Sequence, residues 1–232
     1  MTRHVDAVLF DFSGTLFDDA AVLTVAGVRA AAGARGVALD DGQAARLIEM
    51  SLATADSPDG RARREGCDRS ADRHRAVWTE LLTTAATGFL PGQEPETLAD
   101  AVYACLTDPL SWRPYPDTLS VLTQLHDAGV RLGVVSNIGW DIRPTFAALG
   151  VVDLIPSFTL SCEHGVVKPE PAMFEAGCAG LGVPAARTLF VGDDPVRDGA
   201  ATAVGMPVYL LPHDRAADRP RGLAGVLALA GC

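Results

Sequence analysis

The chain has 232 residues, 48 % hydrophobic and 21 % charged, which suits one large domain or one domain with an insertion. Its net charge of −10 argues against general binding to nucleic acid or to an anionic membrane, because both attractions depend on clustered Lys and Arg. Its five cysteines lack CxxC spacing and indicate buried thiols, not a disulfide framework. Because no apolar run approaches the roughly 18 residues of a membrane span, we expect a cytoplasmic protein.

The first predicted element is a buried strand within residues 6–12, DAVLFDF, which ends at Asp11. About ninety residues rich in Ala, Leu and Arg follow, and their apolar spacing predicts helices. Residues 56–70, DSPDGRARREGCDRS, are polar and charge-rich, and we expect a mobile loop there. The helices are expected within residues 20–36, 41–51, 72–87 and 95–106.

From Asp117 onward, short β-branched apolar runs alternate with amphipathic stretches. Strands are expected within residues 131–136, 155–160, 188–193 and 206–211, and helices within residues 117–129, 171–182 and 196–205. This alternation predicts an α/β fold with a doubly wound, Rossmann-like parallel sheet covered by helices on both faces. The helical stretch then interrupts the sheet domain, so that residues 1–17 and 114–232 form the core and residues 18–113 an all-helical insertion. The prolines of DPLSWRPYP, residues 108–116, support the second boundary because they cannot continue a helix.

Polar side chains stand where the predicted strands end, which is the edge where such sheets bind ligands. Each alone is an ordinary cap or turn residue, but together they are expected to converge on one crevice. Lys168 is the only lysine in the chain, and its compact ammonium suits a phosphate or a carboxylate. The strand-end residues are Asp11, Ser136, Asn137, Lys168, Asp193, Asp194 and Asp198.

In order and placement, these residues resemble the motifs of the haloacid dehalogenase-like hydrolase superfamily, whose members are largely phosphatases. The first motif of that family, D-x-D-G-T, reads DFSGT at residues 11–15. Its strand-end Ser or Thr matches Ser136, and its Lys matches Lys168. Its acidic G-D-x-x-x-x-D matches Asp193 and Asp198, and the helical insertion resembles the family's cap.

The resemblance implies an enzyme that transfers a phosphoryl group from a small phosphorylated metabolite to Asp11 and then to water, with Mg²⁺ as cofactor. The implied catalytic residues are Asp11, Lys168 and Ser136. The implied metal ligands are Asp11, the backbone carbonyl of Ser13, and Asp193. The implied substrate contacts are Ser13, Gly14, Thr15 and Asn137, with Asp194 and Asp198 in support. Nothing in the sequence indicates an oligomeric state.

Ser13 departs from the family pattern, which has a second Asp here to protonate the leaving oxygen and then activate water. A serine hydroxyl is far too weak an acid for this step at neutral pH, and general acid–base catalysis is worth roughly 10²- to 10⁴-fold in rate. We therefore expect a slow phosphatase, or one restricted to good leaving groups, unless a cap residue such as His74 supplies the proton. The cap, with its arginines between residues 61 and 75, is expected to set the substrate.

Two other functions stay open on the same fold. A 2-haloacid dehalogenase also lacks the second Asp, although it uses no metal and the acidic fourth motif would disfavour its carboxylate substrate. A catalytically silent binding or interaction protein would explain Ser13 equally well, although the retained Asp11 and Lys168 argue against it. The sequence argues against phosphonate cleavage through a cap lysine, because the cap contains no lysine.

Overall fold

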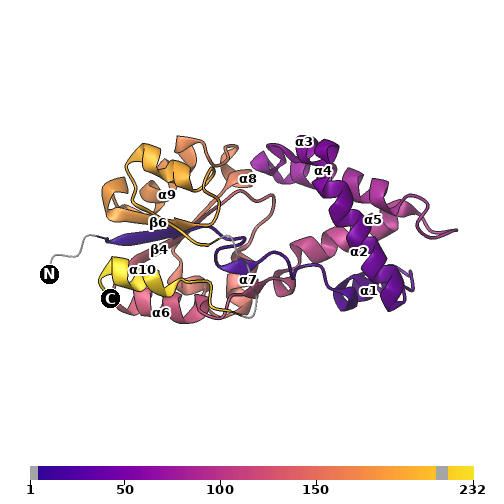
Figure 1. Ribbon diagram of the computed structural model, residues 1–232, viewed down its shortest axis with the longest axis horizontal. Helices are drawn as coiled ribbons and strands as arrows, with labels where there is room; N and C mark the ends of the chain where they lie inside the picture. The colour runs from indigo at the N-terminus through magenta and orange to yellow at the C-terminus, as the bar shows by residue number, and fades with distance from the viewer. Residues whose placement is uncertain (1–4, 213–218) are drawn as a thin grey trace.

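A parallel sheet forms the centre of the larger part of the molecule, and the computed structural model describes residues 5–212 and 219–232 (Figure 1). The strand order is β5-β4-β1-β6-β7, and every neighbouring pair is parallel. The strands are β1 (Ala7–Phe10), β4 (Arg131–Ser136), β5 (Ser157–Leu160), β6 (Thr188–Gly192) and β7 (Val208–Leu210). In the central strand, Phe10 pairs with Val134 on one side and Val191 on the other. The predicted parallel α/β sheet is confirmed.

Helices cover both faces of this sheet, as the alternation of strands and helices predicts. One face is covered by α9 (Pro171–Leu181) and η5 (Gly199–Val204), and the other by α6 (Thr118–Asp127), α7 (Arg143–Ala148) and α10 (Ala224–Ala230). Figure 1 shows α9 above the sheet, and α6 and α10 below it. Because side chains alternate along a strand, Val8 and Phe10 join one apolar core while Ala7 and Leu9 join the other. Shorter segments are α8 (Ser161–His164), η3 (Val152–Leu154) and η4 (Ala185–Arg187).

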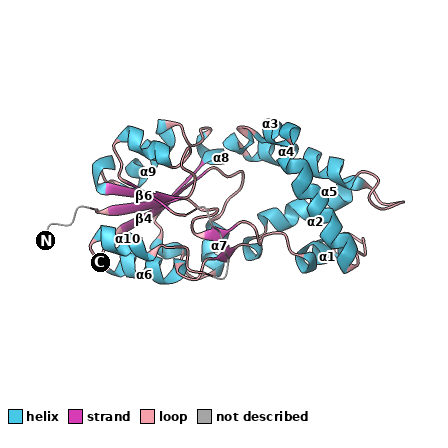
Figure 2. Ribbon diagram, in the orientation of Figure 1, coloured by secondary structure: helices cyan, strands magenta, loops and turns pink. Residues whose placement is uncertain are grey.

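The chain between the first and second strands of the sheet forms a group of helices with its own apolar core, and Figure 2 shows this group at one end of the molecule. We call α1 to α5 the cap helices. They are α1 (Val25–Gly33), α2 (Asp41–Asp56), α3 (Pro58–Arg64), α4 (Ala71–Ala86) and α5 (Pro95–Thr107), with η1 (Cys67–Arg69) and η2 (Pro109–Ser111) beside them. Asp40 and Gln43 form a capping box that starts α2. The core includes Val28, Leu47, Leu82, Leu98 and Val102.

Residues 56–70 are largely helical, so the prediction of a mobile loop there was wrong. Ser57 accepts a hydrogen bond from the Gly60 N–H at 3.0 Å, and Pro58 is the first residue of α3. Together these are a strong helix start, and the charges that suggested a loop lie mostly on exposed positions of the helix. The prediction of a helix within residues 196–205 was only partly right. The structure has a shorter 3₁₀ helix there, η5, and not an α-helix.

The two chain crossings between the sheet and the cap helices form a short antiparallel ribbon of β2 (Phe17–Asp18) and β3 (Arg113–Pro114). The ring of Phe12, two residues beyond β1, packs against Phe17 and Trp112 with centroid separations of 4.7 and 4.8 Å. These aromatic contacts bury the loop that leaves β1 between the ribbon and the sheet. The ribbon therefore fixes the direction in which that loop leaves the sheet.

The cap helices and η1 contact the sheet domain a second time, at α8 and the segment before α9. The Arg69 Nη2 atom lies 2.5 Å from Glu170 Oε1, just before α9. Gly139 lies so close to the His74 ring that an added Cβ would be 2.1 Å from the ring's Cγ. Glycine is therefore needed at this contact. Among the described helices, none combines the length and apolarity needed to cross a membrane.

Candidate active site

Lys168 lies between two carboxylates at the carboxyl edge of the sheet. Its Nζ is 2.7 Å from Asp11 Oδ1 and 2.7 Å from Asp198 Oδ1. The side chain of Lys168 is 2 % exposed and that of Asp198 is 0 %, whereas that of Asp11 is 13 % exposed. Of the three, Asp11 is the group that a solute can reach best. The arrangement presents one carboxylate to solvent and keeps its counter-charge buried behind it.

Asn137 holds the backbone of Lys168 in place. The Lys168 N–H donates to Asn137 Oδ1 at 2.7 Å, and Asn137 Nδ2 donates to the Lys168 carbonyl at 2.9 Å. Asp11 is fixed from the other neighbouring strand, because its N–H donates to the Val191 carbonyl at 2.8 Å. Asn137 thus has a positioning role that the sequence did not predict.

Asp198 connects the acidic loop after β6 to Lys168 through both of its carboxylate oxygens. Its Oδ2 accepts the N–H groups of Asp193 and Asp194 at 2.9 and 3.0 Å, while its Oδ1 meets Lys168. Asp11, Asp193 and Asp198 each offer a carboxylate oxygen, and these three atoms lie within 4.8 Å of one another. Such hard oxygen donors suit a divalent cation. Asp198 is fully buried and both of its oxygens have partners within 2.7–3.0 Å, whereas Asp11 is partly exposed and the side-chain contacts of Asp193 are longer, at 3.4 and 3.8 Å, so Asp11 and Asp193 are the better ligands.

The charges of this cluster perturb one another. Burial raises the pKa of Asp11 to about 7; the charge of Lys168 opposes that rise, and the charge of Asp198 adds to it. Burial alone would lower the pKa of Lys168, but Asp11 and Asp198 favour its ammonium form and raise that pKa. A further cation beside Asp11 would favour the ionised carboxylate.

The first-motif residues after Asp11 turn back toward the acidic loop. Gly14 has φ 72°, a left-handed conformation that favours glycine, and its N–H donates to the Phe17 carbonyl at 2.8 Å. Thr15 is fully buried, and its Oγ1 donates to Asp193 Oδ1 at 3.4 Å. Ser136 is buried at the end of β4, beside the central strand. Contacts therefore join Asp11, Lys168, Asp198, Asp193 and Thr15 into one cluster.

The side chains of two predicted site residues, Asp194 and Ser13, form their hydrogen bonds outside this cluster. Asp194 Oδ1 accepts the N–H groups of Val196 and Arg197 at 2.8 and 2.9 Å, so this side chain closes a turn. Ser13 is half-buried, and its Oγ donates to Asp19 Oδ2 at 3.1 Å. Asp19 was not among the predicted site residues.

Sequence reasoning also missed a buried arginine. Arg221 is 4 % exposed, its Nη2 lies 3.8 Å from Asp193 Oδ2, and its Nε donates to the Gly14 carbonyl at 2.7 Å. Its own N–H donates to Asp117 Oδ1 at 2.7 Å. Arg221 thus adds a positive charge beside Asp193 and ties the C-terminal segment to the first motif. It lies beyond the last strand and outside the motif order, and no pattern in the sequence distinguishes it from the other arginines.

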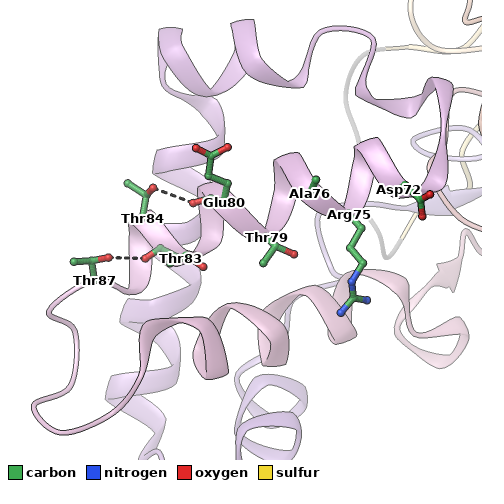
Figure 3. A pocket seen from close by; sticks show the side chains of 8 residues that line it. All are labelled: Asp72, Arg75, Ala76, Thr79, Glu80, Thr83, Thr84 and Thr87. Carbon is green, nitrogen blue, oxygen red and sulfur yellow. Dashed lines mark hydrogen bonds between the residues drawn. The ribbon is translucent and has the colours of Figure 1, made fainter.

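The cap arginines are largely paired with carboxylates. Arg63 lies 2.6 Å from Glu80, and Arg75 lies 3.4 Å from Asp100. Arg75 lines an open hollow of about 600 Å³ along α4. Figure 3 shows the side chains that line it. None of the predicted site residues lines this hollow. It is lined by Asp72, Arg75, Ala76, Thr79, Glu80, Thr83, Thr84 and Thr87.

His74 is placed for packing and not for proton transfer. It is 3 % exposed, and its Nδ1 is 2.9 Å from the Tyr103 hydroxyl oxygen. Its ring centroid is 5.2 Å from that of Trp140. Burial lowers the pKa of His74 to about 4, so the imidazole is neutral at pH 7.

The burial of His74 predicts a pH-dependent loss of stability. Between pH 6.5 and about 4 the unfolded imidazole binds a proton that the folded imidazole does not, so stability falls as the pH falls through this window. The full effect is about 3 kcal/mol. Urea unfolding of the parent and of His74→Gln, at pH 7 and pH 4.5, should show the parent losing more stability on acidification. His126→Gln on α6 is the matched control, and equal losses in parent and His74→Gln would contradict the prediction.

Comparison with known proteins places these features in a family context. A family model described as haloacid dehalogenase-like hydrolase matches residues 5–205. Phosphoglycolate phosphatase of Rhodospirillum rubrum is 29 % identical over 228 residues, which cover 96 % of this chain and 86 % of that protein. Glyceraldehyde 3-phosphate phosphatase of Methanothermobacter thermautotrophicus is 28 % identical over 211 residues, covering 88 % and 84 %. The solved structure of L-2-haloacid dehalogenase from Xanthobacter autotrophicus matches with a TM-score of 0.57 and 26 % identity, covering 89 % of this chain and 77 % of that one.

Proposed function

The chain belongs to the haloacid dehalogenase-like hydrolase family, and on that premise we propose that it hydrolyses small phosphorylated metabolites through a phosphorylated Asp11. The observation that carries the proposal is the exposed face of Asp11 held against the buried Lys168 ammonium. Named phosphatases among the relatives, matched over most of both chains, support the same class of substrate. We further propose that residues 18–113 are a cap domain and that residues 1–17 and 114–232 are the catalytic core.

In the first step an Asp11 carboxylate oxygen attacks phosphorus, and the bond between phosphorus and the leaving oxygen breaks. In the second step water attacks the same phosphorus, and the electron pair of the broken bond returns to the Asp11 carboxylate. Lys168 offsets the charge that gathers when an anionic phosphate meets a carboxylate. The proposed donors to the transferring group are Ser136 and the backbone N–H groups of the first motif other than those of Asp11 and Gly14, which donate within the fold. Asn137 and Asp198 act through Lys168, which they hold in place.

The carboxylate oxygens of this site fit Mg²⁺, a hard cation that takes carboxylates together with water and substrate phosphate. Asp11, Asp193 and the backbone carbonyl of Ser13 would hold it. When bound, Mg²⁺ supplies positive charge that neutralises the phosphoryl oxygens. Arg221 beside Asp193 keeps that carboxylate in place.

The test is phosphate release from acetyl phosphate and from a sugar phosphate, each with Mg²⁺ and with a chelator. We expect release that depends on the metal and that disappears in Asp11→Asn. Asp6→Asn is the matched control, because Asp6 immediately precedes the other end of the same strand. Chloride release from 2-chloropropionate without metal would favour the dehalogenase alternative. Phosphate release that survives Asp11→Asn would overturn the proposed nucleophile.

A further inference from the structure

The segment that carries Lys168, between α8 and α9, is contacted from the cap side by Arg69 of η1. The Arg69 Nη1 atom donates to the Gly165 carbonyl at 3.0 Å, and its Nη2 atom donates to Glu170 Oε1 at 2.5 Å. Gly165 directly follows α8, and Glu170 directly precedes α9. A planar guanidinium presents several donors in a fixed geometry, so one side chain reaches both ends of this segment. We call residues 165–170 the lysine loop.

Glu170 also closes the lysine loop from within. Its Oε1 accepts the Val167 N–H at 3.2 Å, and its own N–H donates to the Val167 carbonyl at 2.8 Å. Arg69 therefore holds the carboxylate that closes a turn containing Lys168. The backbone of Lys168 is also fixed by Asn137, which bonds to both its N–H and its carbonyl. The placement of Lys168 thus depends on two anchors, one from the sheet domain and one from the cap side.

A buried serine joins η1 to the segment after β4 as well. Ser161 Oγ donates to the Asp68 carbonyl at 2.8 Å and accepts the Ile138 N–H at 2.8 Å. Asp68 lies in η1, and Ile138 directly follows Asn137 after β4. Ser161 is fully buried, so solvent has little access to these bonds. The 3₁₀ segment η1 is therefore seated on both segments that hold the Lys168 backbone.

We propose that Arg69 is a positioning residue, which holds the lysine loop so that the Lys168 ammonium meets Asp11. The proposal rests on the proposed phosphatase function, in which Lys168 offsets the charge of the transferring group. The Lys168 Nζ reaches Asp11 and Asp198 at once, at 2.7 Å each, so a small displacement of its backbone disturbs both contacts. Displacements of about 1 Å are enough to slow an enzyme markedly. The reaction then depends on η1 being seated on the sheet domain.

A different role for Arg69, long-range attraction of an anionic substrate, predicts different kinetics. Attraction acts on substrate binding, so removing the Arg69 charge would raise KM and removing the Glu170 charge would lower it. Positioning acts through a contact that both residues make, so either neutral variant lowers kcat in the same direction. The effect of Glu170→Gln therefore separates the two roles.

The experiment measures kcat and KM for acetyl phosphate in Arg69→Gln, Glu170→Gln and the double variant. Because the two side chains are 39 % and 38 % exposed, solvent weakens their ion pair, and we expect kcat to fall about three- to fivefold in each single variant with KM nearly unchanged. The double variant should lose no more than either single variant, because the same contact is removed. Labelling the lysine side chain with ¹⁵N gives one ammonium signal, from Lys168, which should shift or broaden in both single variants.

Arg29→Gln is the matched control. Arg29 Nε donates to the Leu39 carbonyl at 2.9 Å, and its Nη1 donates to Asp41 Oδ1 at 2.7 Å. This arginine therefore makes the same kinds of contact as Arg69, but only within residues 18–113. We expect the parental kcat and an unchanged ammonium signal in this variant, and thermal unfolding checks that every variant is folded.

Two results would overturn the role of Arg69. One is an unchanged Lys168 signal in Arg69→Gln, and the other is a lower KM with the parental kcat in Glu170→Gln. Failure of the parent to hydrolyse acetyl phosphate would instead overturn the proposed function. The Lys168 signal would then still decide whether Arg69 holds the lysine loop, so the two failures are distinguishable.

Discussion

Replacing Lys168 with methionine is expected to lower the free energy of unfolding by about 3–5 kcal/mol and to remove phosphatase activity, because two carboxylates lose the cation between them. Methionine nearly matches the length of lysine, so the loss reports mainly on charge and not on a cavity. Urea unfolding at pH 7 and the kcat for acetyl phosphate measure the two effects. Lys168→Arg should also be inactive, since a planar guanidinium does not replace a point charge held between Asp11 and Asp198.

A second substitution separates the charge effect from general damage. The double variant Lys168→Met with Asp198→Asn removes one buried charge together with its partner and is expected to recover part of the lost stability. Arg187→Met breaks the exposed pair with Asp6 and should cost less than about 1 kcal/mol. Because Lys168 is the only lysine, ¹⁵N-lysine labelling yields a single ammonium signal that reports directly on this site. A loss in Lys168→Met as small as that in Arg187→Met would contradict the assignment.

The sheet and most of its helices were predictable because their signal is local. Apolar runs such as RLGVVS form strands, and parallel strands bring their carboxyl ends to one edge. Asp11, Lys168 and Asp198 therefore meet even though they are far apart in the chain. Residues 56–70 were misread because charge suggested a loop, whereas Ser57 and the following proline start a helix.

The parts of the site that were missed depend on contacts that no periodicity encodes. Arg221 reaches Gly14 across 207 positions, and Asp117 holds the Arg221 backbone from 104 positions away. Asn137 was expected at the substrate, yet its amide is bonded to the Lys168 backbone. The hydrogen bond between Ser13 and Asp19 joins residues only six positions apart, but it depends on how the turn after β1 closes. The absence of the second family Asp could be read from the sequence, whereas the partner of the Ser13 hydroxyl could not.

Asp11→Asn is expected to lower phosphate release by at least about 10⁴-fold, because its amide cannot serve as the nucleophile. The same change should make the metal-free protein more stable at neutral pH by about 1–2 kcal/mol, because it removes a carboxyl whose ionisation is unfavourable in the folded site. Burial raises the folded-state pKa of Asp11 to about 7, so ionising this carboxyl costs free energy in the folded state.

The difference in stability between Asp11→Asn and the parent should depend on pH, and the direction follows from the pKa of Asp11. Between pH 3.8 and about 7 the unfolded carboxyl has lost its proton while the folded carboxyl retains it, so the parent loses stability as the pH rises through that window. Asp11→Asn has no such group, and its advantage over the parent should grow between pH 4 and pH 7. Urea unfolding in the presence of a chelator measures this difference, with Asp6→Asn as control. A variant less stable than the parent at pH 7 would show that the charge of Asp11 stabilises the fold; full activity would place the nucleophile elsewhere.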